Sequence, residues 1–191
     1  MSSKETVISI DAMGSDAGPA PLIAGLAKAK YKNDKLQFIL HGDAKQLAPL
    51  VEKRKIGAFT EIRDCDGVVN MTDKPSQVMR HGKGTSMWSA IASVRDSEAD
   101  VCVSCGNTGA LMALSMVRLR KVEGVSRPAI ACLWPSQNTH GFNVMLDVGA
   151  DVRADERDLL QYALMGASYA RNGLGLGKPR VGLLNVGTEE H

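Results

Sequence analysis

The segment Val7-Ile8-Ser9-Ile10-Asp11-Ala12-Met13-Gly14-Ser15-Asp16-Ala17-Gly18-Pro19 settles which fold class is expected. Val7–Ile10 is a short apolar run that ends at a cluster of turn residues, which is typical of a buried strand. After Pro19, apolar residues recur three and four positions apart (Leu22, Ile23, Leu26, Ala29), which is the spacing of one helix face. A strand, a glycine-rich turn and a helix in this order form the repeating unit of a parallel sheet.

The same alternation continues along the chain. Further strands are predicted at Leu36–Leu40, Phe59–Arg63, Asp100–Ser104, Ala129–Trp134, Asn143–Asp147 and Val181–Val186, and further helices around Leu47–Val51 with Asp43 as the cap, at Thr85–Val94, at Leu111–Val122 and from about Asp155 to Ala170. This alternation predicts an α/β, Rossmann-like three-layer αβα fold with a mostly parallel sheet. No linker or repeat interrupts it, so we predict a single α/β domain over residues 1–191. Because the last strand leads into no covering helix, we interpret the chain as the N-terminal portion of a longer protein, incomplete at its C-terminus.

Composition excludes several classes of protein. The 191 residues carry a net charge of +2, 44% are hydrophobic and 4% are aromatic. A nucleic-acid binder is usually strongly basic or rich in stacking aromatics, and a disordered chain has fewer apolar residues. No apolar run reaches the length of about 20 residues that a membrane helix needs, and Asp11 ends the first run too early for a secretory signal. We therefore expect a cytoplasmic protein whose four cysteines are reduced.

Ligands of such sheets bind at the carboxyl ends of the strands, so the turns there are the first places to search. In the turn Ser104–Ala110, Gly106 and Gly109 let the backbone approach a ligand, and Asn107 and Thr108 can cap the next helix. Backbone N–H groups at that helix start would suit a phosphate or a developing oxyanion. The alternative is a turn with capping residues and no ligand. Similar turns follow at Asp147–Asp151 and Asn185–Glu190.

The first turn holds two carboxylates, Asp11 and Asp16, among glycines that include Gly14. Asp16, close to a helix start, could serve simply as an N-cap. The alternative hypothesis is that one of the two carboxylates orients a substrate, a lysine or a water molecule.

A third candidate region runs from Asp73-Lys-Pro-Ser-Gln77 to Arg80–Trp88, where cations, hydroxyls and glycines lie close together before a helix. Lys83, Thr85 and Ser86 could bind an anion there. A solvated basic loop is the alternative interpretation.

Two cysteines have the spacing of a CxxC motif, Cys102-Val-Ser-Cys105. A zinc site would need a second ligand pair, and a redox motif would begin at a helix start, whereas Cys102 lies in a predicted strand. Cys105 alone could act as a thiolate nucleophile. The histidines His41, His140 and His191 are isolated in the sequence and indicate no catalytic triad.

The chain resembles the bacterial phosphate acyltransferases of phospholipid synthesis, which use acyl-carrier-protein and phosphate. The resemblance rests on several motifs in one order: Asp11–Pro19, Asp73-Lys-Pro-Ser76, Lys83-Gly-Thr-Ser-Met-Trp88, Ser104–Ala110, Arg127-Pro-Ala-Ile130, Leu146-Asp-Val-Gly149, Met165-Gly166 with Tyr169-Ala170, and Val181–Gly187. The chain departs from the family pattern at Ser15, Cys105 and Asp151, where glycine, alanine and asparagine are usual. The usual alanine argues against Cys105 as a nucleophile. Members of the family continue well beyond residue 191, so we expect part of the site, the dimer surface and a membrane-facing helix to lie outside this chain.

The resemblance implies transfer of a fatty acyl group from the carrier-protein thioester to inorganic phosphate, giving an acyl phosphate, with no cofactor or metal. Phosphate is already anionic and a thiolate leaves readily, so the reaction needs anion-binding and oxyanion-stabilising groups more than a strong base. It also implies a cytoplasmic homodimer, with peripheral contact at the inner face of the membrane through the part outside this chain, and a downstream membrane acyltransferase. A phosphate acetyl- or butyryltransferase that uses coenzyme A thioesters, and a non-catalytic acyl-chain or carrier-protein binding module, stay open as alternatives.

We assign the site residues from their placement in the turns, not from the family name. The expected catalytic residues are Asn107, Lys83 and Asp16. The expected phosphate- or substrate-binding residues are Asp11, Gly14, Thr85, Ser86, Ser104, Gly106, Thr108 and Gly109.

Overall fold

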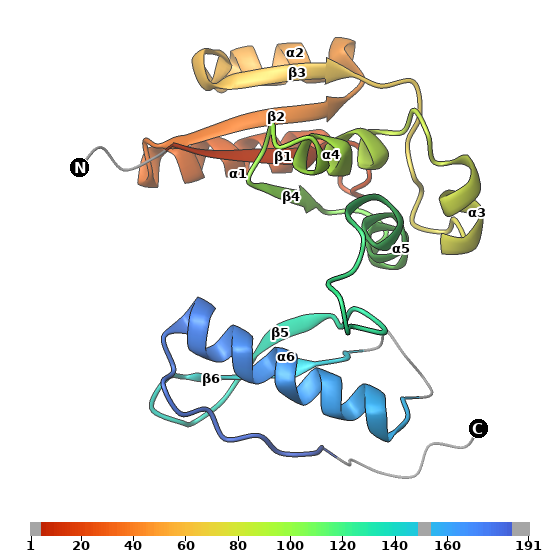
Figure 1. Ribbon diagram of the computed structural model, residues 1–191. Helices are drawn as coiled ribbons and strands as arrows, with labels where there is room; N and C mark the ends of the chain where they lie inside the picture. Colours follow the sequence, from red (N-terminus) through yellow and green to blue (C-terminus); the bar gives the residue numbers. More distant parts are fainter. Residues whose placement is uncertain (1–4, 149–153, 185–191) are drawn as a thin grey trace. The chain divides into compact units, whose positions relative to one another are not determined.

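The computed structural model describes residues 5–148 and 154–184 (Figure 1). The chain divides into two compact units, Met1–Arg120 and Lys121–His191, and each is described by itself below. The single domain expected over residues 1–191 stays a prediction.

The first unit is built on a parallel sheet of four strands in the order β3-β2-β1-β4. The strands are β1 (Thr6–Asp11), β2 (Leu36–Gly42), β3 (Thr60–Asp64) and β4 (Val101–Ser104). In the register of the sheet, Asp11 at the end of β1 lies beside His41 of β2 on one side and Ser104 of β4 on the other. The prediction of a mostly parallel sheet in an α/β fold is thereby confirmed.

Five α-helices belong to this unit: α1 (Pro19–Lys32), α2 (Ala44–Lys53), α3 (Pro75–His81), α4 (Ser86–Arg95) and α5 (Thr108–Leu119). The alternation of side chains along a strand decides which helices they meet. Ile10, Phe38 and Leu40 pack with Ile23 of α1 and Leu47 of α2 in one core cluster. The residues between them in β1 and β2 point the other way and meet α4.

A second core cluster joins α3, α4 and α5 through Val78, Met87, Ile91 and Leu114. With helices on both faces, the sheet is the middle of three layers, as the sequence predicts. Figure 1 shows α3 standing beside α5, apart from the sheet itself.

Helix starts follow the predicted capping chemistry in most places. Asp43 accepts a hydrogen bond from the backbone N–H of Lys45 at 2.9 Å and caps α2, and Thr85 caps α4 through the N–H of Trp88. The alternative interpretation of Asp16 as the cap of α1 is wrong. That helix begins after Gly18, whose φ of 69° suits glycine and which makes no side-chain capping bond.

The structure also contains a helix that the sequence analysis missed. α3 lies in the basic stretch, where the sequence analysis predicted no helix, and Pro75 is in its first turn. It is only seven residues long, and Val78 is its one buried side chain. Such a helix leaves no apolar periodicity to detect.

The second unit contains β5 (Ala131–Pro135), β6 (Phe142–Leu146) and α6 (Glu156–Leu174). The two strands form where predicted, but they pair antiparallel, so they are not part of the parallel sheet. The six residues between them are too few for the crossover that a parallel pair requires, which is a dozen residues or more. Residues 181–184 form no strand, which corrects that part of the predicted Val181–Val186. Residues 185–191, with the Asn185–Glu190 turn, and residues 149–151 of the Asp147–Asp151 turn lie outside the described residues.

None of the helices among residues 5–148 and 154–184 is long and apolar enough to cross a lipid bilayer.

Candidate active site at the carboxyl ends of β1 and β4

A buried carboxylate connects three separate segments at one end of the sheet. Asp11 is 2% exposed, and its two oxygens accept hydrogen bonds from the hydroxyls of Ser86 (2.6 Å) and Ser104 (2.8 Å). Ser86 is the first residue of α4 and Ser104 the last of β4. We call these three residues the Asp11 clasp. Its hydroxyl donors offset the cost of burying a charged group, and the clasp fixes the start of α4 to the ends of β1 and β4.

The two glycine-rich turns meet backbone against backbone. A Cβ atom on Gly14 would lie 3.0 Å from the Cα of Gly106 and 3.0 Å from a carboxylate oxygen of Asp11. A Cβ on Gly106 would in turn lie 3.1 Å from the Cα and the carbonyl oxygen of Gly14. Both distances are shorter than ordinary contacts, so each turn needs glycine at this point. The close approach expected at Gly106 is therefore made, in this structure, to the other turn.

Asn107 is buried, with 8% of its surface exposed, and its side chain is used at both ends. Its Oδ1 accepts the N–H of Ala110 at 3.0 Å and so caps α5. Its Nδ2 lies 3.2, 3.1 and 2.9 Å from the carbonyl oxygens of Asn70, Met71 and Asp73, to which it donates. The amide hydrogens thus point at a loop more than thirty residues away in sequence. These contacts indicate that Asn107 positions that loop.

Two backbone donors are left at the start of α5. The N–H groups of Thr108 and Gly109 make no hydrogen bond to any described residue, and Thr108 is exposed. Unpaired N–H groups at a helix start favour an anion. A Cβ on Gly109 would lie 3.0 Å from the ring of Pro75, so the beginnings of α3 and α5 are also in close contact.

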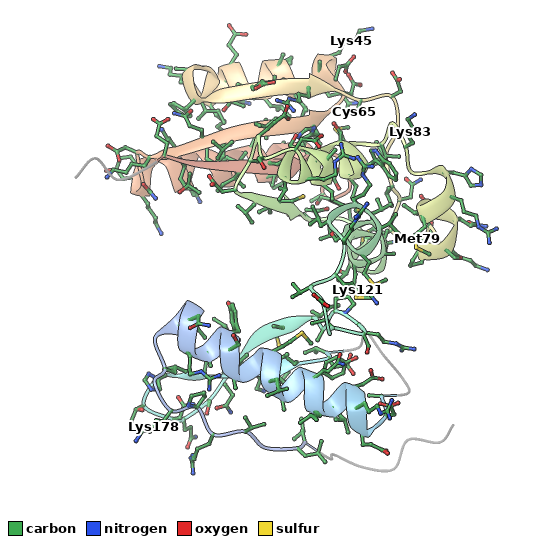
Figure 2. All side chains as sticks on the ribbon, viewed as in Figure 1. Lys45, Cys65, Met79, Lys83, Lys121 and Lys178 are labelled. Carbon is green, nitrogen blue, oxygen red and sulfur yellow. The ribbon has the colours of Figure 1, made fainter. Side chains whose placement is uncertain are left out.

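The remaining predicted residues lie around this arrangement. The hydroxyl of Thr85 already makes two hydrogen bonds with nearby residues. It donates to the carbonyl of Gly82 at 2.7 Å, and it accepts from the N–H of Trp88 as the cap of α4. Lys83, on the connection between α3 and α4, is exposed, and its side chain makes no hydrogen bond or ion pair with the described residues (Figure 2). Asp16 is exposed too and forms no such contact with them, so the structure does not bring it to the clasp.

A buried histidine beside the clasp was missed by the sequence analysis. His41 is fully buried, with its Nε2 2.9 Å from the hydroxyl of Ser9 and its Nδ1 2.8 Å from that of Ser89. The hydroxyl of Ser93 approaches Nε2 at 3.4 Å. We call these four residues the His41 cluster. Burial, and to a lesser extent the nearby Arg63, together lower the pKa of His41 to about 4.

The sequence pattern that could have predicted this cluster is the placement of polar residues along β1. Ser9 and Asp11 interrupt an otherwise apolar strand on one face, and the parallel neighbour carries His41 at the matching height. A strand that places two polar side chains on one buried face needs polar partners there.

The four cysteines form no disulfide. Burial, with a smaller contribution from the Asp11 carboxylate, raises the pKa of Cys102 to about 12, which keeps that thiol protonated. Cys105 is exposed, and all four cysteines are free thiols. Among the described residues, no three His, Cys, Asp or Glu side chains gather as metal ligands would.

Comparison with known proteins adds a family to this geometry. A family model described as "Fatty acid synthesis protein" matches residues 6–191. Among curated proteins, one named "Phosphate acyltransferase" from Ruegeria sp. is 70% identical over 189 residues, which is 98% of this chain and 50% of that protein. Proteins of the same name from Jannaschia sp. and Dinoroseobacter shibae are 68% and 70% identical over 98% and 97% of this chain, and over 52% and 49% of their own lengths. The chain spans about half the length of the curated relatives that it matches.

Proposed function

The chain belongs to the fatty acid synthesis protein family, and from that premise we propose that the whole protein transfers a fatty acyl group from acyl-carrier-protein to inorganic phosphate, giving an acyl phosphate for phospholipid synthesis. The observation that supports this most is the junction at the ends of β1 and β4. There the Asp11 clasp and the Gly14–Gly106 contact place the unpaired N–H groups of α5 on a rigid support.

The proposed reaction needs little acid–base help. An oxygen of hydrogen phosphate attacks the thioester carbonyl carbon, a C–O bond forms, and the carbonyl oxygen becomes an oxyanion. The C–S bond then breaks, and the proton of the phosphate ends on the released carrier thiol. The difficult requirements are to hold an anion beside a thioester and to stabilise the oxyanion, and both depend on fixed donors.

The described residues divide these tasks in the following way. The N–H groups of Thr108 and Gly109 bind the phosphate or the oxyanion, with the ammonium of Lys83 as the nearby cation. The Asp11 clasp holds the start of α4 and the end of β4 in place. Asn107 acts by positioning the 70–73 loop, in line with its hydrogen bonds, and the catalytic role of Asp16 stays a prediction.

The resemblance supports two further parts of the proposal. The whole protein would be a homodimer in the cytoplasm with peripheral contact at the inner face of the membrane. Its acyl phosphate would be consumed by a membrane acyltransferase.

Phosphate-dependent release of the carrier thiol tests the proposal on the full-length protein. The enzyme is mixed with acyl-carrier-protein, phosphate is added, and the free thiol is titrated while the acyl phosphate is trapped with hydroxylamine. We expect thiol release only with phosphate and one hydroxamate for each thiol. Faster transfer from acyl-coenzyme A would favour an acetyl- or butyryltransferase-like enzyme, and acyl-carrier binding without release would favour a binding module.

A further inference from the structure

Beside the candidate site lies a group of exposed basic side chains. The sequence from Lys74 to Arg95 contains no aspartate or glutamate. Lys74, Arg80, His81 and Lys83, on α3 and its two flanks, are all exposed. None of these side chains forms a hydrogen bond or an ion pair with a residue that the structure describes. The charges of Lys74, Arg80 and Lys83 are therefore not neutralised by an ion pair within the described residues.

The nearest carboxylates in sequence do not cancel this charge. Asp73 is committed to its own loop, where it accepts the backbone N–H of Asn70 at 2.8 Å. Asp66 is exposed and precedes the stretch. The excess is thus positive along the outer side of α3.

Apolar side chains are exposed among these cations. Met71 is 47% exposed and Met79 38% exposed, while the preceding residue of α3, Val78, is buried in the core. Figure 2 shows Met79 on α3 and Lys83 on the segment that leaves it. Methionine and arginine are enriched where proteins bind one another, and methionine adapts to an irregular partner. We call Met71, Lys74, Met79, Arg80, His81 and Lys83 the α3 surface.

The α3 surface is held rigidly against the candidate site. Asn107 fixes the loop that carries Met71, and the contact between Pro75 and Gly109 joins the beginnings of α3 and α5. Val78 anchors the middle of the helix. A surface that is already ordered loses little conformational entropy on binding.

We propose that the α3 surface docks an acidic protein that carries the acyl thioester, so that the thioester is presented at the start of α5. This inference rests on the proposed function, which supplies a donor attached to a protein. Carboxylates of the donor would pair with Lys74 and Arg80, and its apolar side chains would pack on Met71 and Met79.

Other kinds of partner fit the α3 surface less well. α3 has seven residues and one exposed apolar side chain, Met79, whereas a helix that lies in a membrane needs a continuous apolar face. The surface contains no Phe, Tyr or Trp, the side chains that offer nucleic-acid bases the largest platform for stacking.

Charge reversal on the full-length protein tests the proposal. In Lys74→Glu/Arg80→Glu, kcat/KM for acyl-carrier-protein should fall at least about tenfold, mainly through KM, and lose most of its salt dependence. With acyl-pantetheine, an uncharged small donor, the double variant should stay within about twofold of wild type. The matched control is Lys28→Glu/Lys45→Glu, on α1 and α2, which carries the same charge change on exposed residues and should behave as wild type. Thermal unfolding verifies that both variants fold.

The carrier provides the reciprocal experiment. Lysines in place of exposed carboxylates of the carrier should slow the wild type and partly restore the double variant. Equal losses with both donors, or no loss with either, would overturn the proposal. So would binding to phosphatidylglycerol vesicles or single-stranded DNA that the double variant abolishes while carrier binding persists. If the wild type transfers acyl groups from no donor, the proposed function fails, and calorimetric titration of the carrier into the same variants decides the docking surface separately.

Discussion

The Asp11 clasp and the His41 cluster lie on the same face of the same sheet, one strand apart, and both hold α4. Asp11 and His41 are even paired in the register of β1 and β2. Their surroundings differ: Asp11 contacts two glycine-rich turns at the strand end, whereas His41 is enclosed by Ser9, Ser89 and Ser93 beneath the helix. The comparison suggests that the clasp serves activity and the cluster serves stability.

The largest effect is expected from Asp11→Asn in the full-length enzyme. The amide keeps the size of the side chain but cannot accept from both Ser86 and Ser104 with the strength of a carboxylate, so α4 and the turns lose their fixed relation. Misplaced groups of this kind cost a hundredfold to a thousandfold in kcat. Asp43→Asn is the control, because asparagine caps α2 as well as aspartate does. Wild-type turnover in folded Asp11→Asn would show that the clasp, like the cluster, is only structural.

Lowering the pH should test the contribution of the His41 cluster to stability. The pKa of His41 is about 4 in the folded protein, whereas an ordinary histidine has a pKa of 6.5, so the unfolded chain binds a proton in this range that the folded chain does not. Stability from this group is complete above pH 6.5 and is lost as the pH falls toward 4, by roughly 3 kcal/mol.

Urea unfolding at a series of pH values measures this loss. The charged groups around His41 are Arg63, Glu61 and Glu98. His41→Gln, which keeps hydrogen-bonding capacity without titrating, should show a flat profile between pH 6.5 and 5. A wild-type profile as flat as that of the variant would contradict a neutral, enclosed His41.

Two substitutions of Asn107 should separate capping from positioning. Asn107→Asp keeps the acceptor for the N–H of Ala110 but loses the donor to the 70–73 loop. We expect about a tenfold loss of kcat/KM together with a loss of roughly 1–3 kcal/mol in the free energy of unfolding, because the loop carbonyl groups lose their donor and face a carboxylate. Asn107→Ala should add a loss of about 1 kcal/mol in the free energy of unfolding, since the cap goes too. Thermal melts and steady-state rates give both numbers. Identical rates for wild type and Asn107→Asp would show that the position of the 70–73 loop does not affect activity.

The smallest effect is expected from Cys105→Ala. Cys105 adjoins Gly106 but is exposed, and its substitution leaves the backbone donors and the Gly14–Gly106 contact unchanged. Turnover should stay within about threefold of wild type. An acyl group trapped on Cys105, together with an inactive alanine variant, would replace direct attack by a covalent mechanism.

Sequence alone predicted the elements whose signal is local. β1, the turn after it and α1 follow from a short apolar run, glycines and periodic spacing, and Asp43, Thr85 and Asn107 cap helices as their residue types suggest. What it missed depends on distant partners. The carbonyl groups to which the Asn107 amide donates lie more than thirty residues away in the sequence. The antiparallel pairing of β5 with β6 follows from the short connection between them more than from the strand propensity of their residues.

The Gly14–Gly106 contact also bears on which positions can drift in evolution. Since Gly14 and Gly106 touch through main-chain atoms, their contact does not depend on the identity of neighbouring side chains. Two of the departures from the family pattern, Ser15 and Cys105, directly adjoin these two glycines. A contact made of backbone thus leaves its immediate neighbours free to vary, while an added methyl group at either glycine would force the turns apart.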